Sequence, residues 1–567
     1  MKHLRKPLTF TAAALSVLLA KSPAEACGGF FCAATQPVNQ AAERIVFADN
    51  GNGTVTAIIQ IEYEGPSENF SWLLPISSVP MGDEIAVASD LAFQRLQAAT
   101  NPQYNLTTRV EGTCRDEGGP TGVGGTSGGF PMGPTGAAGG AGTGGGGVMV
   151  EASGVVGAFE WTVISLSEDL PEPADAAIAW LEENDYDVPE GAGSLLGPYL
   201  EDGLFLLALR LTKGSDTGSI RPIVLTYDAT RPMIPVKLTA VAANDDMGVM
   251  TWVLSSARAV PQNYLSLELN EARINWFNPA SNYESVVIAA ADDAGGRGFV
   301  TEFAGPSSAL TDVVWSSFDE AQWQSLRSGT VFGSFRELFD TAFNAWGTWD
   351  GFWDAARAAI TLPAGVPFED FKLCPGCYPA ALEGSPSGFL DAIASNVIDP
   401  VRETQALIDA HPNITRLYTT MSAAEMTEDP VFTFNPDLPD VSNLHAATRV
   451  IECNSDVTQF DASWRIELPQ GGVIRGTGAA AANATWPAAV DTQPPNFRIL
   501  RVSGSGSGEV VEDNAAKIRS QLADYNATVP RRGGGGCSIF AAGSSAPFGA
   551  AIVAAALGAA LARRRRR

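Results

Sequence analysis

The sequence predicts an α+β fold: a mainly antiparallel sheet domain with an aromatic-rich helical segment and a C-terminal transmembrane sorting helix. Three observations carry this prediction. Short apolar runs typical of strands recur between residues 44 and 255, and aromatic residues gather at helical spacing between 315 and 353. The chain then ends in an uncharged stretch, 539–562, followed by five arginines.

The first predicted strands form a hairpin over residues 44–63. Alternate residues of its second strand share one face, as in a half-buried strand: Val55, Ala57, Ile59, Ile61 and Tyr63. The preceding DNGNG supplies turn residues. A short helix is expected at 89–100, capped by Ser89, and another at 173–184, with proline in its first turn. Further strands are predicted in FSWLLPI, FEWTVISL, LFLLALRL, IRPIVLTY, VKLTAVAA and MTWVLSS.

Residues 318–360 are predicted to form helices crowded with aromatic side chains. Five of the twelve tryptophans lie in or beside this stretch: Trp315, Trp323, Trp346, Trp349 and Trp353. Helical spacing favours a buried core for four phenylalanines, Phe332, Phe335, Phe339 and Phe343. Exposed rings would instead stack on glycans or enter lipid.

The rest of the chain is expected to mix helices and strands. Helices are predicted at 400–411, at 422–429 and at 512–525, and the second begins with a capping box of Ser422 and Glu425. Strands are predicted in RVIEC, ASWRIELP and FRILRV.

Composition and pattern divide the chain into seven segments. They are a signal peptide (1–26), a β-rich part (27–116), a Gly-rich insertion predicted to be disordered (117–147), an α+β part (148–310), an aromatic-rich helical region (311–447), strands with a last helix (448–530), and a Gly-rich hinge with a transmembrane helix and an arginine tail (531–567).

Both ends of the chain indicate export. A basic start, the apolar run FTAAALSVLLA and the small residues Ala24 and Ala26 are typical of a secretory signal removed before Cys27. Lipid attachment at Cys27 is an alternative, although Ala24 and Glu25 stand where a lipobox has leucine and a small residue. At the other end, 539–562 can cross a bilayer as a helix, and the arginines would stay in the cytoplasm.

The C-terminal order of parts is a Gly-rich spacer, Cys537, an apolar span and an arginine cluster. This order resembles the MYXO-CTERM sorting signal of myxobacteria. The resemblance implies a membrane protease that cuts near Cys537, which would be the sorting or lipid-attachment residue. It also implies anchoring at the outer membrane or cell surface of a Gram-negative bacterium. A doubled cysteine is common in that signal, whereas Cys537 stands alone here.

Several motifs between residues 27 and 305 resemble a bacterial secreted family, the domain of unknown function numbered 2330. They include ACGGFFC, PVNQAAERIVF, YEGPSENFSWLLPI and AADDAGGRGFVTEFAG. The family has no established activity, so the resemblance implies no catalytic residues.

The charge of the chain disfavours nucleic acid as a partner. The formal net charge is −27, and removal of both terminal segments would leave 27 basic and 62 acidic residues. Such a surface repels phosphate backbones and favours cations and cationic partners.

The seven cysteines predict disulfides in an oxidising compartment: Cys27, Cys32, Cys114, Cys374, Cys377, Cys453 and Cys537. With Cys537 set aside for sorting, close spacing favours two local pairs, which leaves Cys114 with Cys453. Fifteen connectivities remain open. The spacing of Cys374 and Cys377 also fits a redox dithiol, but the surrounding sequence favours a structural disulfide. A zinc site of four cysteines is a weaker alternative.

Residues for catalysis are sparse. His411, at a predicted helix end, and His445 are assigned structural roles, and no known catalytic motif surrounds them. Acidic pairs are candidate calcium ligands, although solvated loops are the simpler explanation: Asp245–Asp246, Asp292–Asp293 and the run Asp429, Asp437 and Asp440.

We interpret the protein as an uncharacterised, exported cell-surface protein with a non-enzymatic structural or binding role and no assigned cofactor or ligand. The alternative is an extracellular glycan or peptide hydrolase with paired carboxylates such as Glu302 or Glu425. A calcium-dependent adhesin is a third, weaker hypothesis.

Overall fold

The computed structural model describes residues 30–31 and 39–530, apart from 65–70, 83, 116–147, 158, 168–169, 185, 187, 189–190, 212–220, 242, 329–331, 384–385, 479–485 and 488–489. The predicted signal peptide, Cys27, Cys32, the Gly-rich insertion and the sorting segment with Cys537 lie outside the described residues. Within the described ranges, no helix has the length and apolarity needed to cross a membrane.

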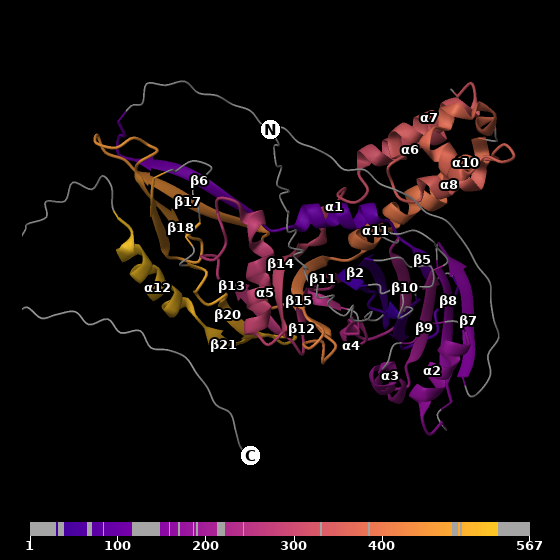
Figure 1. The fold of residues 1–567 in the computed structure, drawn as a ribbon, viewed down its shortest axis with the longest axis horizontal. Coiled ribbons are helices and arrows are strands. Elements are labelled where there is room, and N and C mark those ends of the chain that lie inside the picture. Colours follow the sequence, from indigo (N-terminus) through magenta and orange to yellow (C-terminus); the bar gives the residue numbers. More distant parts are fainter. Residues whose placement is uncertain are drawn as a thin grey trace, which may run out of the picture.

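The centre of the molecule is a ten-stranded sheet (Figure 1). From one edge to the other its strands are β21 (Glu509–Asp513), β20 (Asn496–Arg501), β13 (Leu265–Leu269), β14 (Gly298–Pro306), β15 (Asn413–Met421), β11 (Ala243–Ser255), β2 (Asn39–Asp49), β3 (Thr54–Glu64), β10 (Ile223–Asp228) and β5 (Ile85–Val87). The pairs β2 with β11 and β13 with β14 are parallel, and the others are antiparallel. The predicted α+β class with a mainly antiparallel sheet is confirmed.

A second, five-stranded sheet lies against one end of the central sheet. Its order is β1 (Phe30–Phe31), β4 (Ser71–Ile76), β9 (Phe205–Leu211), β8 (Phe159–Leu166) and β7 (Val148–Val156). Ile45 and Leu225 of the central sheet share a core with Leu74 and Leu207 of the second sheet. The outer face of the second sheet packs against α2 (Pro173–Glu183) and α3 (Ala192–Glu201).

Strands β2 and β3 form the predicted hairpin, and the expected alternation of burial holds over residues 54–57, where Val55 and Ala57 are buried and Thr54 and Thr56 are half-buried. Ile59 and Ile61 of β3 face the core between the two sheets. Ile58 and Gln60 on the opposite face are also buried, because helices cover that side. Over residues 58–61, burial on both faces therefore replaces the expected alternation.

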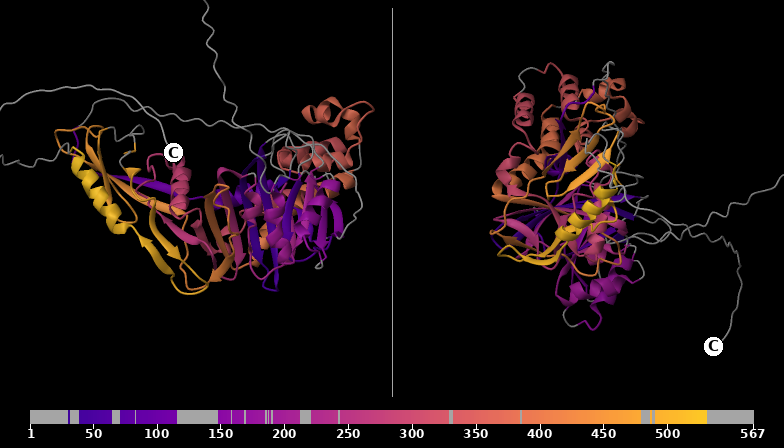
Figure 2. Two further views of the ribbon diagram at one scale, coloured as in Figure 1. Left: turned by 60° about the horizontal axis from the view of Figure 1, so that its bottom comes forward. Right: turned by 90° about the vertical axis from the view of Figure 1, so that its left-hand side faces the viewer.

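Residues 317–398 form a helical lobe that projects from the sheets (Figures 1 and 2). Its helices are α6 (Ser317–Arg327), α7 (Phe335–Trp346), α8 (Phe352–Ala359), α9 (Phe368–Leu373) and α10 (Pro386–Ile393). Trp323 and Trp346 are fully buried in it, and the predicted core position is confirmed for Phe335 and Phe339. It is wrong for Phe343, which is 38 % exposed, and Phe332 is only half-buried because α7 begins after it. Helices α1 (Asp90–Thr100) and α11 (Asp399–Ala410) join the lobe to the central sheet.

At the other end of the molecule lies a four-stranded sheet of β19 (Val473–Thr477), β18 (Ser463–Glu467), β17 (Leu444–Glu452) and β6 (Gln103–Glu111). Helices α5 (Tyr283–Asp293) and α12 (Ala515–Thr528) pack into the same core. Strands β6 and β17 are parallel although they lie far apart in sequence. A disulfide between Cys114 and Cys453 joins the chain just beyond their ends.

Gly112 makes this junction possible. It has a φ of 83°, and a Cβ at this position would lie 2.2 Å from the carbonyl oxygen of Cys453. Any other residue would be both strained and in steric conflict with the partner strand.

Short elements complete the fold. They are the pair β12 (Arg258–Pro261) and β16 (Phe432–Asn435), helix α4 (Val236–Thr239), the 3₁₀ turns Pro279–Ser281, Ser307–Leu310, Pro375–Cys377 and Pro379–Leu382, and one π turn, Ala394–Ile398.

Near α1 one local prediction holds in part, because Ser89 occupies the N-cap position, and near α4 another fails. Helix α1 forms, but Ser89 does not cap it with its own side chain, because the carboxylate of Asp350 accepts hydrogen bonds from Ser89 Oγ (2.6 Å) and Asp90 N–H (3.1 Å). The segment VKLTAVAA was predicted as a strand. Its first four residues are helix α4 instead, and β11 begins only at Ala243.

The predicted helix at 422–429 is also wrong, and the segment forms turns. Half of the capping box is present, because the Ser422 N–H donates to Glu425 Oε2 at 2.8 Å. The Ser422 hydroxyl, however, bonds to Asp246 instead of the first turn of a helix. With Pro430 following so closely, the segment is too short to continue as a helix.

Candidate functional site

A cavity of about 420 Å³ lies between the central and the five-stranded sheets. Strands β2, β3, β4 and β10 supply most of its wall, and Ser77, Leu204, the segment 229–235 and Val431 supply the remainder. The size is within the range of small-molecule sites in proteins.

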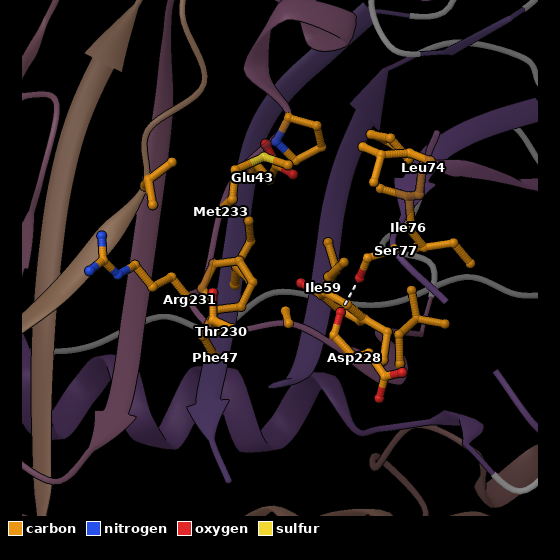
Figure 3. A pocket seen from close by; sticks show the side chains of 18 residues that line it. Glu43, Phe47, Ile59, Leu74, Ile76, Ser77, Asp228, Thr230, Arg231 and Met233 are labelled. Carbon is orange, nitrogen blue, oxygen red and sulfur yellow. Dashed lines mark hydrogen bonds between the residues drawn. The ribbon is translucent and has the colours of Figure 1, made fainter. Parts of the chain in front are cut away.

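The lining of this cavity is predominantly apolar. Nine of the eighteen lining residues are large aliphatic, aromatic or thioether side chains: Ile45, Phe47, Ile59, Leu74, Ile76, Leu204, Leu225, Met233 and Val431. The rim is polar, with exposed Asp228, Thr230 and Arg231. Figure 3 shows Ser77 bonded to the backbone of Asp228, well apart from Glu43.

Glu43 places a carboxyl group at the buried end of the cavity. It lies on β2 two residues before Ile45, so strand alternation directs it to the same inner face as Ile45 and Phe47. The residue is 4 % exposed, and its Oε2 atom has no hydrogen-bond partner among the described residues. An unpaired buried carboxyl is costly, so its retention in this wall suggests a role in binding.

Burial raises the pKa of Glu43 from 4.5 to about 7. Desolvation of the carboxylate is the cause of this shift, and no cation among the described residues opposes it. Near neutral pH the group therefore exchanges readily between its neutral and charged forms. Such a carboxyl can accept a hydrogen bond, pair with a cation or transfer a proton.

The Glu43→Gln variant is expected to become more stable relative to the wild type as pH rises. Below pH 4.5 both folded and unfolded wild-type chains hold the Glu43 proton. Between pH 4.5 and about 7 only the folded chain retains it, so wild-type stability falls with pH until the full penalty is present above 7. Between the two pH limits, the free energy of unfolding of the wild type relative to the variant changes by about 3 kcal/mol. Urea unfolding of both proteins at pH 4 and pH 8 measures this change. The prediction would be contradicted if the two proteins differed in stability by the same amount at both pH values.

The carboxylates proposed for a hydrolase, Glu302 and Glu425, do not line this cavity. Glu302 is buried against Arg416 and accepts a hydrogen bond from Tyr283. Glu425 holds the turn after Met421 and fills the space that Gly296 leaves free. Both carboxylates therefore have structural partners.

The histidines also have structural partners. His411 ends α11, where Nδ1 lies 2.8 Å from the Leu407 carbonyl oxygen, as expected for a residue at a helix C-terminus. His445 lies 2.6 Å from Glu271 and stacks on the ring of Tyr104.

The acidic pairs considered as calcium ligands are dispersed. Asp292 lies near Asp246, and burial together with the charge of Asp246 raises the pKa of Asp292. Asp293 accepts a hydrogen bond from Asn496, and Asp429 pairs with Lys237. In the part of the chain that the structure describes, no three His, Cys, Asp or Glu side chains form a group able to hold a metal.

Two of the three disulfides favoured by spacing can be located. Cys114 pairs with Cys453, and Cys374 pairs with Cys377 in a short 3₁₀ turn after α9. The turn does not begin a long helix after a strand, so it lacks the setting of a thioredoxin-like redox site.

Glu43 stands in no catalytic or ligand-binding motif and in no acidic pair, so it is not among the predicted site residues. A signal was present: within ERIVF, an acidic residue occupies the same strand face as Ile45 and Phe47. A charge in phase with a buried face is unusual enough to mark a candidate site. Its neighbours across the cavity, such as Met233, could not be inferred from spacing.

The fold and the cavity define a mixed α+β protein whose two stacked sheets enclose a site of ligand size. The family model described as "uncharacterized protein conserved in bacteria (DUF2330)" matches residues 21–314, and the chain belongs to this family. The matched segment contains every residue that lines the cavity except Val431. No curated protein and no solved structure matches the chain significantly.

Proposed function

We propose that the protein is an exported binding protein that holds a small, mostly apolar molecule in the cavity between its two sheets. The observation that carries the proposal is the buried, unpaired carboxyl of Glu43 in a wall of apolar side chains. Apolar walls provide affinity, and one polar group fixes the orientation of a ligand.

The lining favours binding over hydrolysis of a glycan. A glycosidase needs two carboxyl groups on either side of one bond and polar groups for the sugar hydroxyls. Of the two carboxylates around this cavity, Glu43 is buried at one end, whereas Asp228 is exposed at the rim.

The binding proposal is tested by calorimetric titration of the protein with decanol. Leu204 lines the cavity, and the Leu204→Trp variant is expected to abolish saturable binding by filling it. Leu195→Trp is the matched control, since Leu195 is a similarly half-buried leucine in α3 that does not line the cavity. Absence of saturable binding to the wild type, or equal binding to both variants, would refute the proposal.

Export forms the second part of the proposed function. The basic and apolar start of the chain supports removal of a signal before Cys27, and the spacer, Cys537, apolar span and arginines support sorting to the surface. We expect Cys537→Ala to block processing, so that the uncut chain accumulates in the inner membrane fraction. Normal surface delivery of this variant would contradict the role of Cys537.

A further inference from the structure

The surroundings of Glu43 narrow the chemistry of the ligand. Its register partners on the two neighbouring strands are Val249 on β11 and Ile61 on β3, both apolar. The other titratable side chains that line the cavity are Tyr227, Asp228 and Arg231.

Three charged groups on the adjoining elements have partners other than Glu43. Lys237 of α4 lies 3.2 Å from Asp429, and Asp246 of β11 bonds to Ser422. Arg231 at the rim donates to the side chain of Gln262. No ion pair reaches Glu43 among the described residues, so a ligand has to provide any counter-charge that its carboxylate receives.

Resting on the proposed function, we propose that the cavity binds an apolar primary amine, with its ammonium group against Glu43 and its hydrocarbon body along the apolar wall. The exposed rim formed by Asp228, Thr230 and Arg231 places the cavity entrance away from Glu43. The head group therefore lies at the buried end and the tail extends toward the rim.

Three head groups can be compared on physical grounds. A ligand carboxylate would place a like charge beside Glu43 and is disfavoured. An alcohol would donate one hydrogen bond, which satisfies Oε2 but leaves the charge of the carboxylate uncompensated. An ammonium group donates charge-assisted hydrogen bonds and neutralises the carboxylate, so it gains most from this environment.

The experiment titrates the full-length protein with decylamine, decanol and decanoate at pH 8. Wild type is expected to bind decylamine at least tenfold more tightly than decanol, and decanoate most weakly. The Glu43→Gln variant should lose the preference for the amine. Asp228→Asn is the matched control, because it removes a carboxylate from the rim of the same cavity, and it should retain the preference.

The pH dependence provides a second measurement that needs no variant. The carboxyl of Glu43 has to be ionised to pair with the amine, and burial raises its pKa to about 7. Decylamine stays protonated throughout this range. Its affinity should therefore fall about tenfold for each pH unit below 7, whereas the affinity for decanol should change little.

The outcomes separate this inference from the proposed function. Equal affinities for decylamine and decanol in the wild type, or an amine preference that survives Glu43→Gln, would overturn the amine assignment while leaving a functional apolar cavity. A preference lost in Asp228→Asn but kept in Glu43→Gln would overturn it as well. If none of the three ligands binds, the proposed function fails and this inference fails with it.

Discussion

Replacing Arg416 by methionine is expected to lower the free energy of unfolding by about 3–5 kcal/mol, because it leaves the carboxylate of Glu302 buried without a counter-charge. Nε of Arg416 lies 2.6 Å from Oε2 of Glu302, and the two side chains are 2 % and 1 % exposed. Urea unfolding at neutral pH measures the loss.

The surroundings of this ion pair explain the size of the effect. Arg416 on β15 also donates to Thr100 Oγ1 at 3.1 Å and lies over the ring of Trp252. Tyr283 at the start of α5 donates to the other oxygen of Glu302. The pair thus connects the central sheet to α1 and α5, and both of its side chains are buried from bulk solvent.

Two controls make the prediction specific. The double variant Arg416→Met and Glu302→Leu removes both charges, so it should recover much of the stability lost in the single variant. The matched control is a surface ion pair between Arg501 and Glu509, whose side chains are 61 % and 71 % exposed. Arg501→Met should cost less than about 1 kcal/mol. A loss in Arg416→Met as small as that in Arg501→Met would contradict the account.

Removing the disulfide between Cys114 and Cys453 is expected to cost about 4–5 kcal/mol. The two cysteines are 339 residues apart, so the bridge restricts a very large loop in the unfolded chain. The bridge also fixes the ends of β6 and β17, which depend on each other for pairing. The double variant Cys114→Ala and Cys453→Ala, compared with the wild type by urea unfolding, tests this expectation.

The chain contains a matched control for loop length. Cys374 and Cys377 are three residues apart, and their removal should cost about 2 kcal/mol or less on the same entropic grounds. Equal losses from the two double variants would show that loop length does not determine the contribution of these bridges.

Local patterns predicted many elements of the fold. The hairpin of β2 and β3, the proline-initiated helix α2 and the strand β18 were all recognisable from periodicity and turn residues. These patterns depend on neighbours in sequence, so they are readable without tertiary information.

Long-range pairing could not be predicted in the same way. The parallel pair β6 and β17 forms the four-stranded sheet from strands separated by more than half of the chain. The turn at 422–429 took its conformation from Asp246, which lies on a distant strand. In both cases a contact far away in sequence determines the local structure.

In the candidate site too, some features follow from the local sequence and others only from the tertiary structure. Alternation along β2 already places Glu43 on the buried face, but only the folded chain shows that Oε2 lacks a partner and that a cavity lies beside it. The absence of a cation near Glu43 among the described residues is likewise a property of the assembled sheets.

The most direct test of the account is a carbon-13 NMR titration of the Glu43 side-chain carboxyl, assigned by comparison with Glu43→Gln. We predict a midpoint near pH 7, because burial in the cavity raises the pKa of this group. Addition of decylamine should move the midpoint downward as the ammonium stabilises the carboxylate. A midpoint near 4.5, unchanged by the amine, would show that Glu43 is solvated and would contradict the central claim.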